Sequence, residues 1–234
     1  RNIIVIKRDK SQFQIIENEF AKPQNVIHIS GNSIVEIVDS LEVNANKIIQ
    51  KIHQTEIAEF QKTIKTAQIE NKKIQTKFNI LIDIPKNYKY VIRKSKFVWL
   101  KKEVSSGNLS LIAYQIPLNH IKSIKNQSKQ IIKTRDSISN LYIHGSSNNA
   151  QMLTDLTFSP LTIETEIDQK KAFETKGLWN INSDFMSGPF LNYQIFDKKH
   201  NRILVFEGFC YAPSKPKRDF MLELEAIIKS IHIK

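Results

Sequence analysis

Short apolar runs recur along this chain and predict many β-strands. Two of them, at 2–7 and 26–30, stand near the N-terminus, and residues 13–20 are compatible with a further strand. Runs of this length between Gly, Pro, Asn and Ser are typical of strands joined by turns, and Ser-Ser-Gly-Asn at 105–108 favours a hairpin. The remaining predicted strands are 79–84, 89–94, 97–102, 109–116, 152–158, 161–167, 172–179, 190–196 and 203–211.

Apolar residues spaced three or four positions apart predict four helices. The first begins near Asn32 or Ser33, which are both good N-caps, and a longer one runs over 44–77. A third is predicted over 119–137. The last begins at about Pro216, because proline is well tolerated in the first turn of a helix.

Strands joined by short turns, with helices arriving in separate blocks, predict an α+β fold. We expect mainly antiparallel sheet with helices packed on one face. The chain is also compatible with two similar halves, each of them β-rich and ending in a helix. The expected organisation is a single domain over 1–234, with 1–78 and 79–234 as possible sub-units and a loop at 144–150. Because the chain opens directly in a strand-like run, we also expect a natural segment upstream of Arg1.

Composition narrows the class of protein without naming a function. With 234 residues and 41% hydrophobic content the chain can bury a substantial core. No stretch approaches the roughly 18 consecutive apolar residues of a membrane helix. A single cysteine, Cys210, excludes an internal disulfide and a multi-cysteine metal site. Since Phe209 and Tyr211 flank it in an apolar strand, we expect a buried, inert thiol.

The chain is strongly basic, with a net charge of +12 and a pI near 9.6, which raises nucleic acid or an anionic surface as a partner. Only six of its 35 basic residues are arginine, the side chain preferred for reading bases and phosphates, so nucleic acid is the weakest of these classes. Fourteen Lys or Arg residues stand against four carboxylates between positions 44 and 102. A solvated helical face with a basic hairpin explains this excess more simply than an anion-binding surface, which stays an alternative.

The segment 174–219 holds the most distinctive chemistry, including three of the six glycines and three of the seven prolines. Within it, the predicted strand 203–211 is apolar on both faces, as central strands are. Glu207 in its middle needs a cation or several donors, because an unpaired buried carboxylate is prohibitively costly. Gly208 permits close approach of another chain or ring, and Trp179 is a plausible neighbour. The candidate cationic partners of Glu207 are Lys176, Arg202 and Arg218.

The start of the last predicted helix carries an unusual charge pattern. Lys215, Lys217 and Arg218 place positive charge where the helix dipole is already positive. Three explanations are compatible with this pattern: solvation of the charges, an external phosphate, sulfate or carboxylate, or internal compensation by Glu207, Glu174 or Asp219.

Several short motifs follow one another in a distinctive order. They are Glu174-x-Lys176-Gly177-Leu178-Trp179, Met186-x-Gly188-Pro189-Phe190, Glu207-Gly208-Phe209-x-Tyr211-Ala212-Pro213 and Lys217-Arg218, with weaker support from Phe97-x-Trp99-Leu100, Arg135-Asp136-Ser137 and Arg1-Asn2-Ile3-Ile4. In order and spacing the chain resembles an uncharacterised family of Bacteroidetes lipoproteins, the domain of unknown function DUF4837. It departs from the family at Lys176, where Arg is usual, and at Ser187, where Gly is usual. The first departure argues against a bidentate role at 176.

The resemblance carries expectations about location but none about activity. It implies export and a lipid anchor on a cysteine upstream of Arg1, and therefore a periplasmic or outer-membrane place in the cell envelope. In such proteins a segment precedes the strand that corresponds to 2–6. The family has no assigned activity, so the resemblance implies no catalytic residue.

Other signatures of chemistry are sparse. The six histidines are scattered without metal-ligand spacing, and there is no nucleophile elbow, phosphate-binding glycine loop or dinucleotide fingerprint, so we expect neither metal nor cofactor. Glu174 and Glu207 are compatible with a glycosidase-like carboxylate pair, although both lie in mid-strand. Trp99 and Trp179 are compatible with sugar stacking, but a core position is favoured.

Together with the envelope location that the resemblance implies, the sequence favours a non-enzymatic cell-envelope protein that binds another protein or an anionic envelope component. A glycan- or cell-wall-acting hydrolase that uses Glu174 and Glu207 in a cleft beside Trp179 is the alternative, and nucleic-acid binding is the least favoured. No catalytic residue is assigned. The candidate structural or ligand cluster is Glu174, Lys176, Trp179, Glu207, Tyr211, Lys217 and Arg218.

Overall fold

The computed structural model describes residues 2–70, 72–121, 127–145, 150–181 and 184–234. The chain forms two compact units, Arg1–Glu59 and Phe60–Lys234. The division falls inside the first helix, earlier than the boundary at 78/79 considered from the sequence. Within the described ranges, no helix combines the length and apolar character that a membrane crossing requires.

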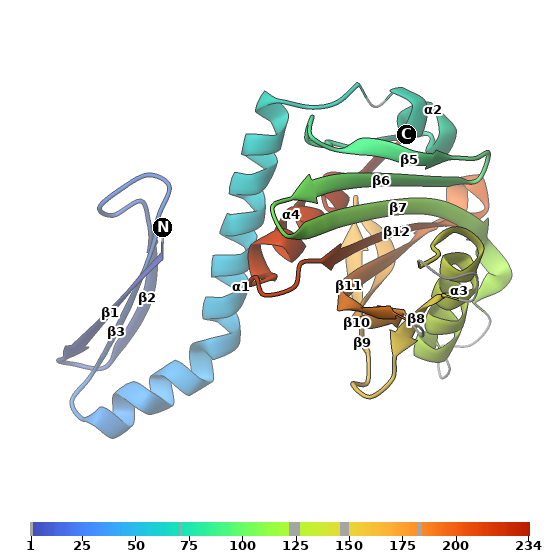
Figure 1. Ribbon diagram of the computed structural model, residues 1–234. Coiled ribbons are helices and arrows are strands. Elements are labelled where there is room, and N and C mark those ends of the chain that lie inside the picture. The colour runs from blue at the N-terminus through green and yellow to red at the C-terminus, as the bar shows by residue number, and fades with distance from the viewer. Residues whose placement is uncertain (1, 71, 122–126, 146–149, 182–183) are drawn as a thin grey trace. The chain divides into compact units, whose positions relative to one another are not determined.

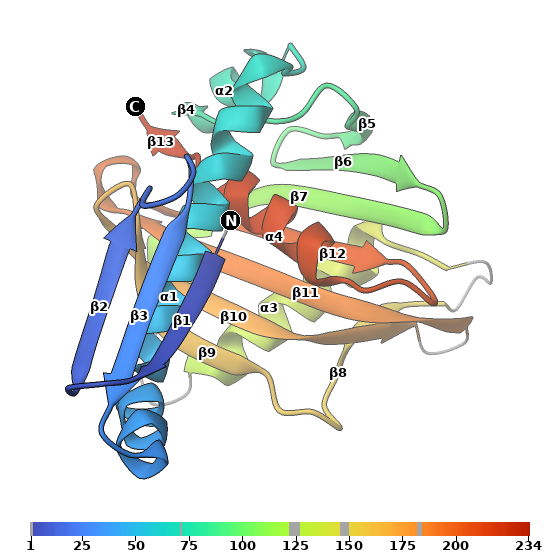
Figure 2. The same ribbon diagram turned by 90° about the vertical axis from the view of Figure 1, so that its left-hand side faces the viewer.

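The N-terminal unit has a three-stranded sheet with the order β1-β3-β2 (Figure 2). β1 (Asn2–Arg8) runs parallel to β3 (Asn25–Gly31), and β2 (Gln12–Glu17) runs antiparallel to it. These strands confirm the prediction for this part of the chain. Ile27 and Ile29 of β3 form a small buried core with Ile48 of the following helix, because alternate residues of a strand point to one face.

The first helix, α1, spans Ile34–Thr66 and is capped where the sequence predicts. The Ser33 hydroxyl accepts a hydrogen bond from the Glu36 amide at 3.2 Å, and the Glu36 carboxylate accepts one from the Asn32 amide at 2.9 Å. The two helices predicted separately are continuous here, because no Gly or Pro interrupts the backbone between them.

The predicted long helix ends earlier than its apolar pattern indicates. The Ile69 amide donates to the Ile84 carbonyl at 3.0 Å, and the Lys86 amide donates to the Ala67 carbonyl at 3.1 Å. These bonds to a later segment compete with the helical ones, so the chain leaves α1 after Thr66. It resumes as a separate short helix, α2 (Lys72–Phe78).

The C-terminal unit is built on one large antiparallel sheet (Figure 1). Its central pairing joins β7 to β12, which are far apart in sequence, and every described pairing within it is antiparallel. The α+β class with mainly antiparallel sheet is thereby confirmed. The strand order is β5 (Lys89–Arg93), β6 (Phe97–Val104), β7 (Gly107–Pro117), β12 (Arg202–Tyr211), β11 (Asp184–Asp197), β10 (Lys170–Ile181) and β8 (Met152–Asp155), and β9 (Leu161–Ile167) also pairs with β10.

Two helices cover opposite faces of β12. Arg135 of α3 (Gln127–Tyr142) contacts Glu207, whereas a Cβ added at Gly208 would lie 2.7 Å from the Cβ of Leu224 in α4 (Arg218–Ile228). Because 207 and 208 are consecutive, their side-chain directions point to opposite faces. The expectation that helices occupy one face is therefore wrong for this pair. The close neighbour of Gly208 is Leu224 and not Trp179.

The other elements differ modestly from their predicted bounds. The predicted helix at 119–137 is replaced by a single 3-10 turn, η1 (Leu118–His120), and by α3, which begins later and extends further; residues 122–126 lie outside the described residues. The central part of the predicted loop at 144–150 also lies outside them. The predicted strand 79–84 is reduced to β4 (Ile80–Leu81), which pairs with the C-terminal β13 (His232–Ile233).

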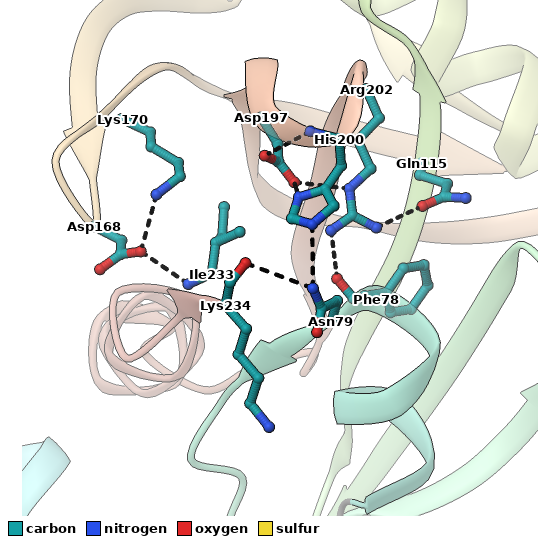
Figure 3. A network of polar contacts seen from close by, with 10 residues as sticks. All are labelled: Phe78, Asn79, Gln115, Asp168, Lys170, Asp197, His200, Arg202, Ile233 and Lys234. Carbon is teal, nitrogen blue, oxygen red and sulfur yellow. Dashed lines mark hydrogen bonds and ion pairs between the residues drawn. The ribbon is translucent and has the colours of Figure 1, made fainter.

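A polar network surrounds the end of β11 (Figure 3). The buried carboxylate of Asp197 accepts a hydrogen bond from Nε of Arg202 at 2.8 Å, and Nδ1 of His200 lies 2.8 Å from the same oxygen. Arg202 also donates to the Gln115 side-chain oxygen at 3.0 Å and to the Phe78 carbonyl at 2.6 Å. Arg202 therefore links three segments, and its guanidinium serves Asp197 and not Glu207.

The same network reaches the C-terminal end of the chain (Figure 3). Asn79 lies 3.2 Å from Nε2 of His200 and donates to the Lys234 carbonyl at 3.5 Å. The carboxylate of Asp168 accepts a hydrogen bond from the Ile233 amide at 2.8 Å. These contacts hold β4 and β13 against the large sheet. The β4–β13 ladder has two residue pairs, and a ladder that short is weak by itself.

Candidate functional site

Glu207 lies in the centre of the C-terminal unit with none of its side chain exposed. Nε of Arg135 donates to its carboxylate at 3.0 Å, and Nη2 of the same guanidinium lies 3.0 Å from the same oxygen. Nδ2 of Asn192 donates to the other carboxylate oxygen at 2.9 Å. The prediction of a buried acid with a cationic partner is confirmed. Its proposed partners are wrong, because the cation is Arg135.

Arg135 is itself held on several sides. Its Nη1 donates to Asp136 and to the Thr154 hydroxyl, both at 3.0 Å, and its guanidinium lies 4.0 Å from the centre of the Phe190 ring. Asp136 also accepts hydrogen bonds from the amide and hydroxyl of Thr154. The arginine therefore ties α3 to β8, β11 and β12, and these contacts identify it as part of the scaffold.

Burial dominates the electrostatics of this pair. Removal from water raises the pKa of Glu207, and the Arg135 charge and the Asn192 hydrogen bond oppose that rise. Burial likewise raises the pKa of the neighbouring Tyr114, which stays a neutral phenol at physiological pH. A carboxylate that is enclosed by protein and engaged on both oxygens has no free lone pair directed at solvent, so it is poorly placed for catalysis.

Glu174 belongs to a second buried cluster. Nζ of Lys176 lies 2.5 Å from its carboxylate and 3.8 Å from that of Glu225 in α4. Glu225 also receives Nζ of Lys229 at 2.7 Å and a hydrogen bond from the Tyr193 hydroxyl at 3.2 Å. Burial lowers the pKa of Lys176, but the hydrogen bond and charge of Glu174 outweigh it and raise the pKa overall. Burial, followed by the charges of Glu225 and Glu174, raises the pKa of Tyr193.

The strand register separates Glu174 from Glu207. Glu174 pairs with Tyr193, and Tyr193 pairs with Phe206, so these three side chains share one face of the sheet. Glu207 belongs to the opposite face because it follows Phe206 directly. A cooperating carboxylate pair must flank one glycosidic bond in a shared cleft, which side chains on opposite faces of a packed sheet cannot do. The hypothesis of a hydrolase that uses Glu174 and Glu207 together is therefore wrong.

The predicted basic residues at the start of α4 join neither cluster. Arg218 lies at the surface with its Nη1 3.1 Å from Asp219, and both side chains are mostly exposed. This favours local compensation by Asp219 among the three explanations for the charge. Lys217 contributes to the environment of Cys210, whose thiol is buried; burial raises its pKa to about 11, against a smaller opposing effect of Lys217. A thiol with that pKa is inert, as predicted.

Trp179 and Tyr211 lie in a third place, an aromatic pocket of about 490 Å³. The Trp179 ring stands edge to face against Phe209 with centroids 5.8 Å apart, and Trp99 lies 6.4 Å from the same ring. Gly188 is required beside Trp179, because an added Cβ would meet the Cys210 carbonyl oxygen at 2.0 Å. Met152, Met186, Ile143 and Ile181 complete the apolar walls, and Lys101, Asn108, His144 and Asp184 supply polar groups.

The seven predicted site residues are thus distributed over separate places. Glu174 and Lys176 lie together, Trp179 and Tyr211 lie together, and Glu207, Lys217 and Arg218 lie apart from both pairs. No cluster of three or more His, Cys, Asp or Glu suited to a metal ion occurs in the part of the chain that the structure describes.

All of the motifs that carry the resemblance except Arg1-Asn2-Ile3-Ile4 lie within one family match. The family described as Domain of unknown function (DUF4837) matches residues 66–230, which contain the large sheet, α2, α3 and α4. The chain belongs to the DUF4837 family. Residues 1–65 match a second family, described as Domain of unknown function (DUF8532). No curated protein matches the chain in sequence.

Two solved structures are distantly similar to the DUF4837 chain. One is the Ran-binding protein Mog1p of Saccharomyces cerevisiae, with a TM-score of 0.40, 9% identity, and coverage of 66% of this chain and 89% of that one. The other is a mutant of the protein Mog1, with a TM-score of 0.37, 8% identity, and coverage of 66% and 90%.

Sequence reasoning missed the residues that complete the Glu207 site of this DUF4837 protein. Arg135 lies 72 positions from Glu207, and Asn192 lies 15 positions from it. Only the Arg135-Asp136-Ser137 motif carried a signal, and nothing local connected it to Glu207. The aromatic pocket likewise joins Trp99 to Trp179 through the β6, β7, β12, β11, β10 order of the sheet.

Proposed function

We propose that the DUF4837 region is a non-enzymatic binding module whose aromatic pocket receives an apolar side chain of a protein partner. The observation that carries the proposal is the pocket itself. It is large enough for a bulky side chain, and its walls combine Trp, Phe, Tyr and Met. These residue types are enriched at the centres of protein interfaces, where polar residues form the rim.

The geometry of the pocket favours an apolar side chain over a sugar. Sugar stacking needs an open ring face, but only 2% of Trp179 is exposed and its ring packs edge to face with Phe209. Lys101 at the rim is paired with Glu103 at 2.9 Å, and Asn108 and His144 offer further polar contacts. A partner segment that inserts an apolar side chain into the pocket and presents its polar backbone to the rim matches this arrangement.

The proposal places the protein in the cell envelope, with a lipid anchor upstream of Arg1. This part rests on the resemblance to lipoproteins and is tested separately. The full-length protein in its natural host should partition with membranes and incorporate labelled palmitate. Recovery in the cytosolic fraction without label would contradict the envelope location. It would not bear on whether the aromatic pocket binds a protein partner.

Photo-crosslinking tests the binding function directly. A photoreactive phenylalanine analogue replaces Met186, which lines the pocket, and cells are irradiated. We expect a discrete protein adduct that disappears when Trp99→Ala is added, because that change removes one wall. The matched control carries the analogue at Lys199, an exposed residue at the other end of β11. The same adducts from both positions, or no protein adduct from position 186, would overturn the proposal.

A further inference from the structure

A second pocket, of about 650 Å³, lies at the edge of the large sheet beside α2. Its lining residues belong to α2, β5 and β6, the elements at the upper part of the C-terminal unit in Figure 1. It shares no lining residue with the aromatic pocket. It is therefore a separate site that the proposed function does not use.

The floor of this second pocket is apolar. Ile74 and Val98 are buried, and the partly buried ring of Tyr90 stands beside them. The hydrocarbon stems of neighbouring lysines extend the apolar surface, as long basic side chains commonly do. A ligand that sits on this floor gains by burying an apolar body.

The rim of the pocket is cationic. Among the described residues that line it are Lys72, Lys73, Lys77 and Arg93, and none of the lining residues is acidic. Lys72 has an exposed partner in Glu70 at 3.3 Å, and Nζ of Lys77 donates to the Lys94 carbonyl. The Lys77 contact satisfies hydrogen bonding but leaves the positive charge uncompensated.

The four cations line the same pocket. Lys73 and Lys77 stand four positions apart on α2, where like charges face each other and repel. The guanidinium of Arg93 lies 5.0 Å from the centre of the Tyr90 ring, which orients it at the pocket wall. A bound anion would relieve the repulsion and gain charge-assisted hydrogen bonds from the lysines and the arginine fork.

We propose that this pocket binds a phosphate group carried on an apolar body. The apolar floor selects the body and the four cations select the phosphate, so neither part alone should bind well. The phosphate can belong to a membrane lipid or to a soluble amphiphile, because both present the same chemistry. The site goes beyond the proposed protein-binding function and can fail or succeed independently of it.

Calorimetric titration of the full chain with three probes tests the site. Hexyl phosphate has both parts of the ligand, inorganic phosphate has only the charge, and hexanol has only the apolar body. We expect one hexyl phosphate per chain and at least about tenfold weaker binding of the other two probes. Equal affinity for hexyl phosphate and inorganic phosphate would overturn the proposal, because the floor would then contribute nothing.

Two charge-matched variants separate a local site from general attraction. Lys73→Gln/Arg93→Gln removes two rim charges and should weaken hexyl phosphate binding by about tenfold or more. Lys129→Gln/Lys133→Gln removes two exposed charges on α3, whose Ser128 contacts Thr162 of β9 at the other edge of the sheet, and should change it by less than about twofold. Circular dichroism confirms that both variants are folded. Equal losses in the two variants, or none in the first, would overturn the site.

Vesicles identify the source of the phosphate. If the ligand is a lipid, the wild type cosediments with phosphatidylglycerol vesicles and not with phosphatidylcholine vesicles, and Lys73→Gln/Arg93→Gln abolishes cosedimentation. If the ligand is soluble, hexyl phosphate still binds with the same dependence on Lys73 and Arg93, and no vesicle is bound. Cosedimentation that the pocket variant retains would show that the membrane contacts another surface and would contradict a lipid in this pocket.

Discussion

The Arg135 guanidinium and the Glu207 carboxylate lie 3.0 Å apart, and neither side chain is exposed to solvent. The two residues come from a helix and from the central strand of the sheet, on the face opposite to α4. Burial of such a pair costs desolvation energy for both charges, and this cost offsets much of the attraction between them. The pair therefore supports the fold only when its geometry is good. Loss of one partner leaves the other charge buried without compensation.

We therefore expect Arg135→Met to lower the free energy of unfolding by about 3–5 kcal/mol, and Glu207→Gln to lower it by more than about 1 kcal/mol. The double variant Arg135→Met/Glu207→Leu should recover much of the loss, because it removes both charges and keeps the volume. Urea denaturation monitored by tryptophan fluorescence measures all three. A wild-type midpoint for Arg135→Met would show that the pair does not support the fold.

The Arg135→Met variant should also show a distinct pH dependence. Burial raises the pKa of Glu207, so the folded state binds a proton more readily than the unfolded state does. The stability associated with this group therefore falls as pH rises above the unfolded pKa of about 4.5. Because Arg135 opposes the rise in the pKa of Glu207, its removal should raise that pKa further. The free energy of unfolding of the variant should therefore be closer to that of the wild type at pH 5 than at pH 8. A constant difference over that range would contradict the explanation.

The stability that Asp197 contributes should depend on pH in the opposite direction. Burial opposes its ionisation, but hydrogen bonds from Arg202 and His200, with their charges, lower its pKa below the ordinary value of 3.8. A lowered carboxyl pKa stabilises the folded state above the unfolded value, and that contribution is lost as pH falls through the folded pKa. Asp197→Asn should lower the free energy of unfolding by about 1–3 kcal/mol at pH 7.

The difference between wild type and Asp197→Asn should shrink as pH falls below the ordinary pKa of 3.8, because the unfolded chain then binds a proton at Asp197 more readily than the folded state does. Denaturation curves at a series of pH values measure it. Asp155→Asn is the control, because the Asp155 carboxylate accepts a local hydrogen bond from the Thr157 amide, two residues away. A difference that is unchanged from pH 7 to pH 3 would show that the ionised form of Asp197 is not what stabilises the C-terminal network.

Gly188→Ala should destabilise the C-terminal unit through steric conflict alone. An added Cβ would lie 2.0 Å from the backbone oxygen of Cys210 and 3.1 Å from Nε1 of Trp179. Since a backbone atom cannot move aside cheaply, we expect a loss of at least about 1–3 kcal/mol and a shift of the tryptophan emission. The neighbouring Ser187→Ala, at an exposed position, should change stability by less than about 0.5 kcal/mol. Equal stability of the two variants would contradict the close approach.

Much of the local structure follows from residues that are near each other in sequence. The apolar alternation of 203–211 indicates a central strand, and a carboxylate inside it indicates a buried ion pair, because both conclusions depend only on solvation and on the period of a strand. The caps at Asn32 and Ser33 and the inert thiol of Cys210 follow in the same way.

The errors occur where a distant segment competes with a local preference. The apolar stripe of 44–77 favours one helix, but residues 67–69 hydrogen-bond to 84–86 and end it. Helix α3 extends past its predicted end to Tyr142, whose ring stacks on Phe97 of β6 with centroids 4.0 Å apart. Local periodicity does not contain the energy of those long-range contacts, so it misplaces the ends of helices more often than the helices themselves.

The sequence by itself determined that this protein has an α+β fold with mainly antiparallel strands, that it resembles DUF4837, and that Glu207 lies inside with a cation beside it. Only the tertiary structure decided which cation it is, which face each carboxylate occupies, and which aromatic residues share a pocket. The physical reason is the strand register. A shift of one residue moves every side chain of a strand to the opposite face of the sheet. The pairing of β7 with β12 and the packing of α3 and α4 on the sheet depend on contacts between residues far apart in the chain.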